Sequence, residues 1–445
     1  MKKSFLHILL LSGLLAFSFG AQAKLFNGDE FVLDNGLRVI VLPNHKAPIV
    51  KHMVWYKSGG ADELSGKGGS AHLLEHLMFR GTDNVSGEEF NRLTEENGMD
   101  GNAFTGQDMT AYHQSLDVTR LELAMFLEAD RMQHLQISDK DFALERDIVF
   151  QERKQRVDNN PVAYFGEVLR RSLWQEHPYA RPVTGMPEEI MSLTRDDVID
   201  FYNKHYTPNN AILVLSGDID VSTARDLAQK YYGGLKKHPQ LNKKDFPELE
   251  NPSRFRVDMS RPQINAYRVT RVFAAPSVNF MAEDIYALSV LSAYLGEGET
   301  SRFYKKLVVD DKVAVGVSTS YDFASRSYGT FNISAVPQQG VSPEELLKRL
   351  DDEWENSVNA LNKAKLEKVK NKMLSGMVYL RDNPNEAANI VGALAVAGMS
   401  LADIEAQEDK IRAVTVEQVR SAARRLKEKS SQIEGILRPE RQEVL

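Results

Sequence analysis

A polar and irregular segment in the middle of the chain, residues 236–256, is the feature that most limits what this sequence can fold into. Most of it reads KKHPQLNKKDFPELENPSR, without a sustained apolar periodicity. The chain has 445 residues, which is too many for one hydrophobic core. We therefore interpret 236–256 as a linker that joins an N-terminal domain, residues 24–235, to a C-terminal domain, residues 257–445.

The apolar patterns on the two sides of this linker follow a similar order. Alternation about Asn35-Gly36 predicts a β-hairpin, and the spacing of Leu73, Leu74 and Leu77 predicts a helix over 68–80. Before the linker we also predict strands at 49–59, within 101–117 and at 211–219, and helices at 87–97, 119–134 and 139–157. After it we predict strands, a helix near 281–295, strands at 313–336 and helices from 342 onward. The fold class is therefore α+β, in two halves of comparable size.

The first residues have the layout of a secretory signal peptide. A basic start at residues 1–3 precedes a mostly apolar run over 5–20 and the small-residue pattern Ala-Gln-Ala at 21–23. The alternative is a membrane anchor, but polar residues interrupt the run, and it is short for a span of ~20 residues. We expect cleavage after Ala23, a mature chain without a membrane segment, and a periplasmic location.

Composition narrows the functional classes. The chain contains no cysteine, so a metal site must use His, Asp or Glu, and disulfides are excluded. Its formal net charge is −7 and becomes more negative once the signal peptide is removed. This charge argues against nucleic acid or an anionic membrane surface as a partner.

The sequence His72-Leu-Leu-Glu75-His76 lies within the helix predicted over 68–80. Residues four apart on a helix share a face, with Cβ atoms ~5–6 Å apart, so both imidazoles can bind one ion. Glu75 then lies beside that ion, where a carboxylate can take a proton from an activated water. A catalytic zinc takes three protein ligands, so the motif lacks one.

The helix predicted over 139–157 offers that ligand. Glu145 and Glu152 are seven residues apart and therefore lie on one helix face. From spacing alone, either carboxylate could complete the metal sphere while the other orients a ligand imidazole. A solvated charged helix is the alternative for this segment.

The order His-x-x-Glu-His resembles the inverted zincin motif of the pitrilysin or insulinase family. The resemblance extends to LDNGLRVIVLPN, GGSAHLLEHLMFRGT, NAFTGQDMTAYH, HPYARPVTGMPEEI and HYTPNNAILVLSGDID. It implies two homologous α/β-sandwich halves that form a clamshell, with one zinc ion in the N-terminal half. It also implies that His72, His76 and Glu152 bind zinc, that Glu75 is the catalytic base, and that Glu145 matches the family's additional glutamate.

The resemblance further implies a peptide-binding edge. The family binds extended peptides along the edge of a sheet, and the matching residues are Asn102, Ala103 and Phe104. Such β-augmentation recognises the backbone of a peptide more than its side chains. An ordinary strand start is the alternative reading of this segment.

The C-terminal domain departs from the family pattern. Family members carry an arginine and a tyrosine that reach the substrate, and the gapless match places Val308 and Val315 at these positions. Arg302 and Tyr304 lie upstream and could take the role if the loop were shifted. The chain therefore resembles the zinc-bearing member of a pair whose partner is a homologous subunit with the arginine and tyrosine but without zinc. The alternatives are a homodimer and a chain that acts alone with low or narrow activity.

The predicted function is that of a zinc-dependent endopeptidase acting on unfolded or extended peptides. A catalytically idle peptide-binding or assembly subunit is the main alternative, and a different zinc hydrolase chemistry on the same ligands is a third. The presence of Glu75 together with all three candidate ligands favours the enzyme.

Overall fold

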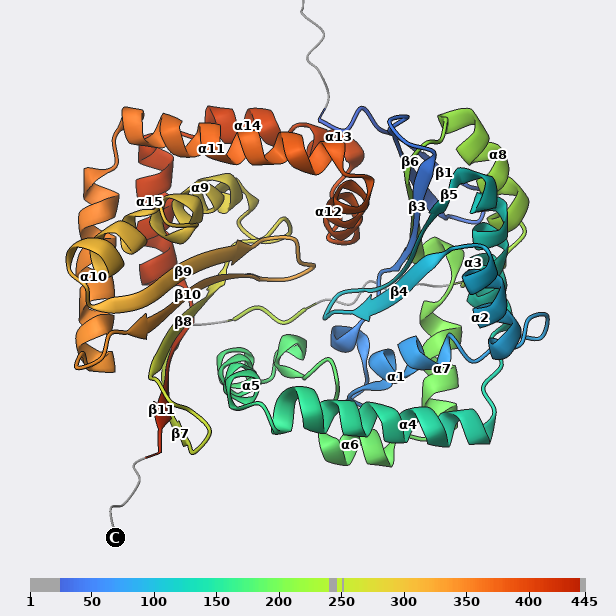
Figure 1. The fold of residues 1–445 in the computed structure, drawn as a ribbon, viewed down its shortest axis with the longest axis horizontal. Coiled ribbons are helices and arrows are strands. Elements are labelled where there is room, and N and C mark those ends of the chain that lie inside the picture. The colour runs from blue at the N-terminus through green and yellow to red at the C-terminus, as the bar shows by residue number, and fades with distance from the viewer. Residues whose placement is uncertain (1–24, 240–245, 250–251, 441–445) are drawn as a thin grey trace, which may run out of the picture.

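The computed structural model describes residues 25–239, 246–249 and 252–440, arranged about two mixed β-sheets (Figure 1). We refer to residues 25–239 as the first half and to residues 252–440 as the second half. The predicted signal peptide, residues 1–23, lies outside the described residues. Within the described ranges, none of the helices combines the length and apolarity that a membrane crossing requires.

The first sheet has the strand order β1-β2-β6-β3-β5-β4, with β2 and β6 parallel and the other pairs antiparallel. The predicted hairpin is confirmed, because Val32 pairs with Arg38 across a turn in which Gly36 has a φ of 91°. The strands are β1 (Asp29–Val32), β2 (Arg38–Pro43), β3 (Ile49–Tyr56), β4 (Asp100–Thr105), β5 (Thr110–Asp117) and β6 (Ala211–Gly217). Strand β4 therefore forms one edge of the sheet.

Helices cover one face of this sheet and enclose the main core of the first half. The helices predicted before the linker are confirmed, and Ser138 caps the longest of them by accepting the Asp141 N–H at 3.0 Å. That helix ends at Arg153 and continues as a π-helical turn over Lys154–Asp158. The helices are α1 (Ser70–Leu77), α2 (Gly87–Glu96), α3 (Leu121–His134), α4 (Asp139–Arg153), α5 (Pro161–Trp174), α6 (Pro187–Ser192), α7 (Arg195–His205) and α8 (Val221–Tyr232).

The second sheet has the order β7-β11-β8-β10-β9. Its strands are β7 (Arg254–Arg261), β8 (Arg268–Ala275), β9 (Ala314–Asp322), β10 (Gly329–Pro337) and β11 (Gln432–Pro439). The helices of the second half are α9 (Ile285–Gly296), α10 (Pro343–Ala360), α11 (Lys363–Asp382), α12 (Pro384–Val396), α13 (Leu401–Glu405), α14 (Gln407–Ala413) and α15 (Val416–Lys429).

Two expectations for the second half need correction. The expectation of helices alone after 342 is wrong, because β11 inserts between β7 and β8 and buries Ile433, Ile436 and Leu437. The predicted linker, residues 236–256, extends too far at its C-terminal end, because β7 already begins at Arg254. Exposed and partly buried residues alternate along this strand. Other parts of the linker, 240–245 and 250–251, lie outside the described residues, and the division into two domains stays a prediction.

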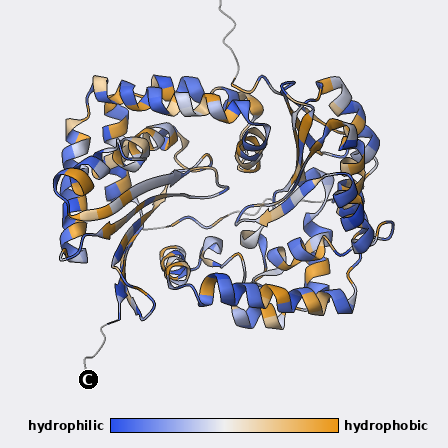
Figure 2. Ribbon diagram, viewed as in Figure 1, coloured by the Kyte–Doolittle hydropathy of each residue, from blue (hydrophilic) through white to orange (hydrophobic). Residues whose placement is uncertain are grey.

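Each half places one helix on the other half's sheet. Helix α12 packs against β3 and β6, where Val391 and Leu394 join Trp55 and Val214 in a buried cluster. Figure 2 shows hydrophobic residues on α12 and on the neighbouring strands. In return, α5 packs against β11 and β7, with Phe165 among its buried contacts. The first sheet is therefore buried on both faces.

Helix α12 approaches β3 so closely at Gly392 that adding a single methyl group there should destabilise the protein. A Cβ at Gly392 would lie 2.1 Å from Trp55 Cε2. We expect Gly392→Ala to lower the free energy of unfolding by about 1–3 kcal/mol through overpacking. The control is Gly376→Ala in α11, where nothing lies within 4 Å of the added carbon, and it should stabilise the helix by about 0.5–1 kcal/mol. Denaturant melts of both variants measure these changes, and a stabilised Gly392→Ala would contradict the described packing.

Candidate metal centre

The structure brings together His72 and His76 of α1 and Glu152 of α4. Glu152 Oε2 lies 3.7 Å from His72 Nε2 and 3.3 Å from His76 Nε2. One candidate ligand atom from each residue lies within 4.8 Å of the others, and no second such group was found among the described residues. The two histidines of α1 thus lie next to the carboxylate of Glu152, which follows His76 by 76 residues in the chain.

The packing of α1 explains why this set is formed. Leu73, Leu74 and Leu77 are fully buried, so the apolar side of α1 faces the core and the histidine side faces α4. At the helix start, the buried carboxylate of Glu63 accepts the Ala71 N–H at 2.9 Å. Burial raises the pKa of Glu63 to about 8, although the backbone hydrogen bonds oppose this rise.

Glu145 lies on the other side of the His76 ring. Its Oε2 is 2.9 Å from His76 Nδ1, and its Oε1 accepts from Arg80 Nε at 2.6 Å. Burial disfavours the carboxylate, but the bonds from His76 and Arg80 outweigh it and lower the pKa of Glu145. His76 therefore presents Nδ1 to Glu145 and Nε2 to Glu152.

The electrostatics of the site fit a cation. Burial and the neighbouring His76 lower the pKa of His72 to about 4, which keeps this imidazole neutral at pH 7. Burial also lowers the pKa of His76, but Glu145 and Glu152 outweigh it and raise that pKa to about 9. Within the described residues, the buried Oε2 of Glu152 makes no hydrogen bond of good geometry. Two imidazoles and one carboxylate are a donor set that zinc accepts.

Glu75 lies on α1 beside His76, and its carboxylate accepts a hydrogen bond from the Thr105 hydroxyl. Burial raises the pKa of Glu75, although the bond from Thr105 opposes the rise. A carboxylate with a raised pKa is a better proton acceptor near neutral pH. Sequence reasoning did not find Thr105, because a contact between residues 30 apart on a helix and a strand has no local signal.

Arg156 was also missed. It lies on the π-helical turn after α4 and pairs with Glu152 Oε1 at 2.7 Å, opposite the oxygen that faces the histidines. The side chain of Arg153 anchors this turn through Glu167 and Gly185 O, each at 2.8 Å. The four-residue spacing of Glu152 and Arg156 was the available signal.

The three residues expected to bind peptide lie on β4, which pairs with β5 alone within the described chain. Ala103 packs against the main core, whereas Phe104 lies on the other face, 5.4 Å from the ring of Trp55. The Asn102 side chain accepts the Ala103 N–H at 2.8 Å. Thr105 is the last residue of this strand, and its hydroxyl donates to Glu75. The edge strand is therefore in contact with the candidate base.

Of the four residues at or near the clamp positions, three are packed or paired within the second half and one is exposed. Val308 packs against the core of the second half, and Val315 is 59% exposed on β9. Arg302 pairs with the buried Glu353 at 3.0 Å, and Tyr304 packs against the same core. Arg302 is therefore held within its own half.

Comparisons with known proteins identify the family of this chain. Residues 38–186 match the family model described as insulinase (peptidase family M16), and residues 192–373 match the one described as peptidase M16 inactive domain. The chain is 28% identical over 383 residues to the zinc protease PqqE of Helicobacter pylori, covering 84% of this chain and 85% of that protein. It is 25% identical over 401 residues to cytochrome b-c1 complex subunit 1 of Rattus norvegicus, covering 87% and 82%.

A solved structure shows the same fold. The crystal structure of a protease from Helicobacter pylori superposes with a TM-score of 0.84 at 24% identity, covering 93% of this chain and 99% of that one. The mixed helix and sheet arrangement in two parts is therefore the fold of the M16 peptidases.

Proposed function

Because the chain belongs to the insulinase family of peptidases, M16, we propose that it is a zinc-dependent endopeptidase that hydrolyses extended peptides. The observation that carries this proposal is the convergence of His72, His76 and Glu152, with Glu75 on the same helix. In this proposal Glu152 is the third ligand, and Glu145 orients His76 from the opposite ring nitrogen.

The mechanism assigns a task to each of these side chains. Zinc held by the three ligands would polarise the scissile carbonyl and acidify the attacking water. Glu75 accepts a proton from that water and can deliver it to the leaving nitrogen, with Thr105 holding one carboxylate oxygen. Asn102, Ala103 and Phe104 offer the edge of β4 to the peptide backbone.

The alternative of an idle subunit has some support, since one relative is a cytochrome b-c1 complex subunit and one matched model is named an inactive domain. The arrangement of Glu75 beside the three candidate ligands favours catalysis. We propose secretion to the periplasm on the basis of the predicted signal peptide, residues 1–23. A homologous partner chain that supplies the missing arginine and tyrosine is part of the proposal.

The first prediction concerns the metal. His72→Ala, His76→Ala and Glu152→Ala should each sharply reduce the zinc content of the purified chain, because each removes one of three ligands. Glu145→Ala should keep the site but weaken zinc binding about 10- to 100-fold. Elemental analysis and chelator competition measure both effects, with exposed Glu95→Ala as the control. Full zinc in Glu152→Ala would place the third ligand elsewhere.

The second prediction concerns the base. Glu75→Gln should keep zinc and bind peptide while kcat falls by about 10²-fold or more. Thr105→Val is the companion variant, because it removes the bond that lowers the pKa of Glu75. That pKa should rise further, and the acidic limb of kcat/KM should move to higher pH, since activity requires the deprotonated carboxylate. Near wild-type turnover in Glu75→Gln would exclude this mechanism.

The third prediction concerns the partner. The isolated chain should hydrolyse quenched peptides poorly, because Val308 and Val315 cannot donate hydrogen bonds and Arg302 is held by Glu353. A homologous subunit with the arginine and tyrosine should form a heterodimer and raise turnover about 10- to 100-fold. Light scattering measures heterodimer formation, and the peptide assay measures turnover. A partner variant that lacks this arginine is the control. Robust cleavage by the chain alone, unchanged by the partner, would contradict it.

A further inference from the structure

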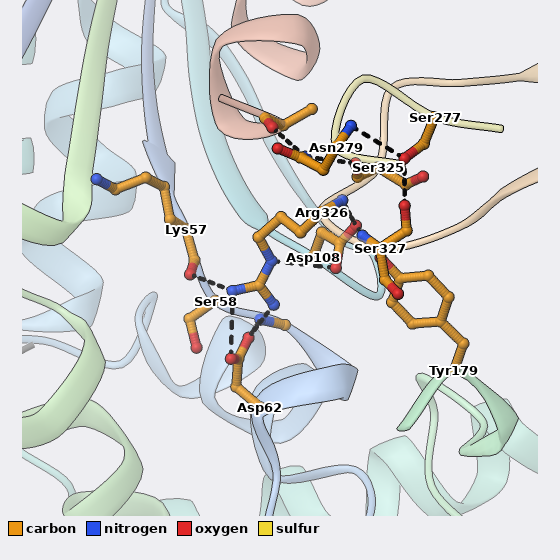
Figure 3. A network of polar contacts seen from close by, with 12 residues as sticks. Lys57, Ser58, Asp62, Asp108, Tyr179, Ser277, Asn279, Ser325, Arg326 and Ser327 are labelled. Atoms are coloured by element: carbon orange, nitrogen blue, oxygen red, sulfur yellow. Dashed lines mark hydrogen bonds and ion pairs between the residues drawn. The ribbon is translucent and has the colours of Figure 1, made fainter. Parts of the chain in front are cut away.

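Arg326, in the loop between β9 and β10, reaches from the second half into the first (Figure 3). Its guanidinium donates to Asp62 Oδ2 at 2.6 Å, to Asp108 Oδ1 at 3.1 Å and to the Lys57 carbonyl at 3.2 Å. Its backbone N–H also donates to Asp108 Oδ2 at 2.9 Å. One side chain of the second half therefore joins two separate loops of the first half.

This contact is buried and has little freedom. The side chains of Arg326, Asp62 and Asp108 are 18%, 7% and 8% exposed. The Tyr179 hydroxyl donates to Asp108 Oδ2 at 2.6 Å and accepts the Ser327 N–H at 3.0 Å. Because a planar guanidinium holds two carboxylates in fixed directions, the loops that carry them are fixed relative to each other.

The two loops are also bonded directly to each other. The Gly60 N–H donates to the Gly106 carbonyl at 3.0 Å, and the Ala61 N–H donates to the Gln107 carbonyl at 2.9 Å. A Cβ at Gly59 would lie 2.3 Å from the Gly106 oxygen, so the backbones approach as closely as glycine allows. Loops 57–62 and 106–109 thus behave as one unit, which Arg326 fastens to the second half.

Both loops lead to the candidate catalytic groups. Asp62 directly precedes Glu63, whose carboxylate accepts the Ala71 N–H at the start of α1. Asp108 lies three residues after Thr105, whose hydroxyl binds Glu75. The contact of Arg326 is therefore connected to the start of the zinc-site helix and to the side chain that orients the base.

We propose that Arg326 is a positioning residue, which docks the second half on loops 57–62 and 106–109 and so holds Thr105 and α1 in the arrangement that aims Glu75. This inference rests on the proposed function. Its consequence is that the second half contributes to the chemistry of a site whose ligands all lie in the first half. An ion pair that only stabilises the contact between the halves is the competing explanation.

The test compares Arg326→Gln with Arg271→Gln. Arg271 is a similarly buried arginine, 12% exposed, which pairs with Asp351 and Glu434 inside the second half. Both variants should lose thermal stability and keep zinc. Only Arg326→Gln should lower kcat, by roughly 10- to 100-fold with KM little changed, because a misaimed base slows chemistry more than binding. Equal kcat values in the two variants would overturn the proposal.

A double-mutant cycle tests the route through Thr105. If Arg326 acts through this residue, Arg326→Gln in the Thr105→Val background should reduce kcat little further, with KM again little changed. Independent, multiplicative losses would overturn the proposal. Should Arg326→Gln fail to fold, Asp108→Asn replaces it in the same comparison.

Hydrogen exchange separates this inference from the proposed function. Amides of residues 70–78 and 102–109 should exchange at least several-fold faster in Arg326→Gln than in Arg271→Gln, whether or not the wild-type chain cleaves peptides. Faster exchange in a chain without peptidase activity would refute the function and keep the positioning role. Unchanged exchange in these segments, with wild-type activity present, would refute the positioning role alone.

Discussion

The exchange of helices between the two halves is the packing interaction on which the rest of the structure depends. Each sheet has a second apolar face that its own half leaves uncovered, and α12 and α5 cover these faces reciprocally. Burial of apolar area is the main favourable term in folding, so neither half can keep its fold at full stability without the other. The close approach of Gly392 to Trp55 and of Gly435 to Phe165 shows how tightly both contacts are packed.

This exchange also sets the surroundings of the candidate metal centre. Helix α4 ends at the turn that carries Arg156, and α5 follows from that turn onto the second sheet. Arg153 ties the turn to α5 through Glu167, so the segment that follows Glu152 is bonded to the helix that packs on the second sheet. The network about Arg326 adds a second link, on the side of Glu75. A site with all of its ligands in one half is thus supported from both.

The candidate site shows where sequence reasoning stops. His72, Glu75 and His76 could be grouped from spacing, because a helix repeats its geometry every turn. Spacing left Glu145 and Glu152 equivalent, and family resemblance was needed to choose between them. In the structure the two carboxylates face opposite nitrogens of one imidazole. No local pattern encodes this, since it depends on how α4 is rotated and set against α1.

The sequence by itself determined local elements such as the hairpin about Gly36 and the helix that carries both histidines, because apolar periodicity and turn chemistry act over a few residues. It did not determine β11, whose short apolar run acquires a strand partner only inside the second sheet. It also did not place Thr105 on Glu75 or Arg326 on Asp62 and Asp108. These contacts join residues far apart in the chain, and only the packing of sheets and helices brings their side chains within hydrogen-bonding distance.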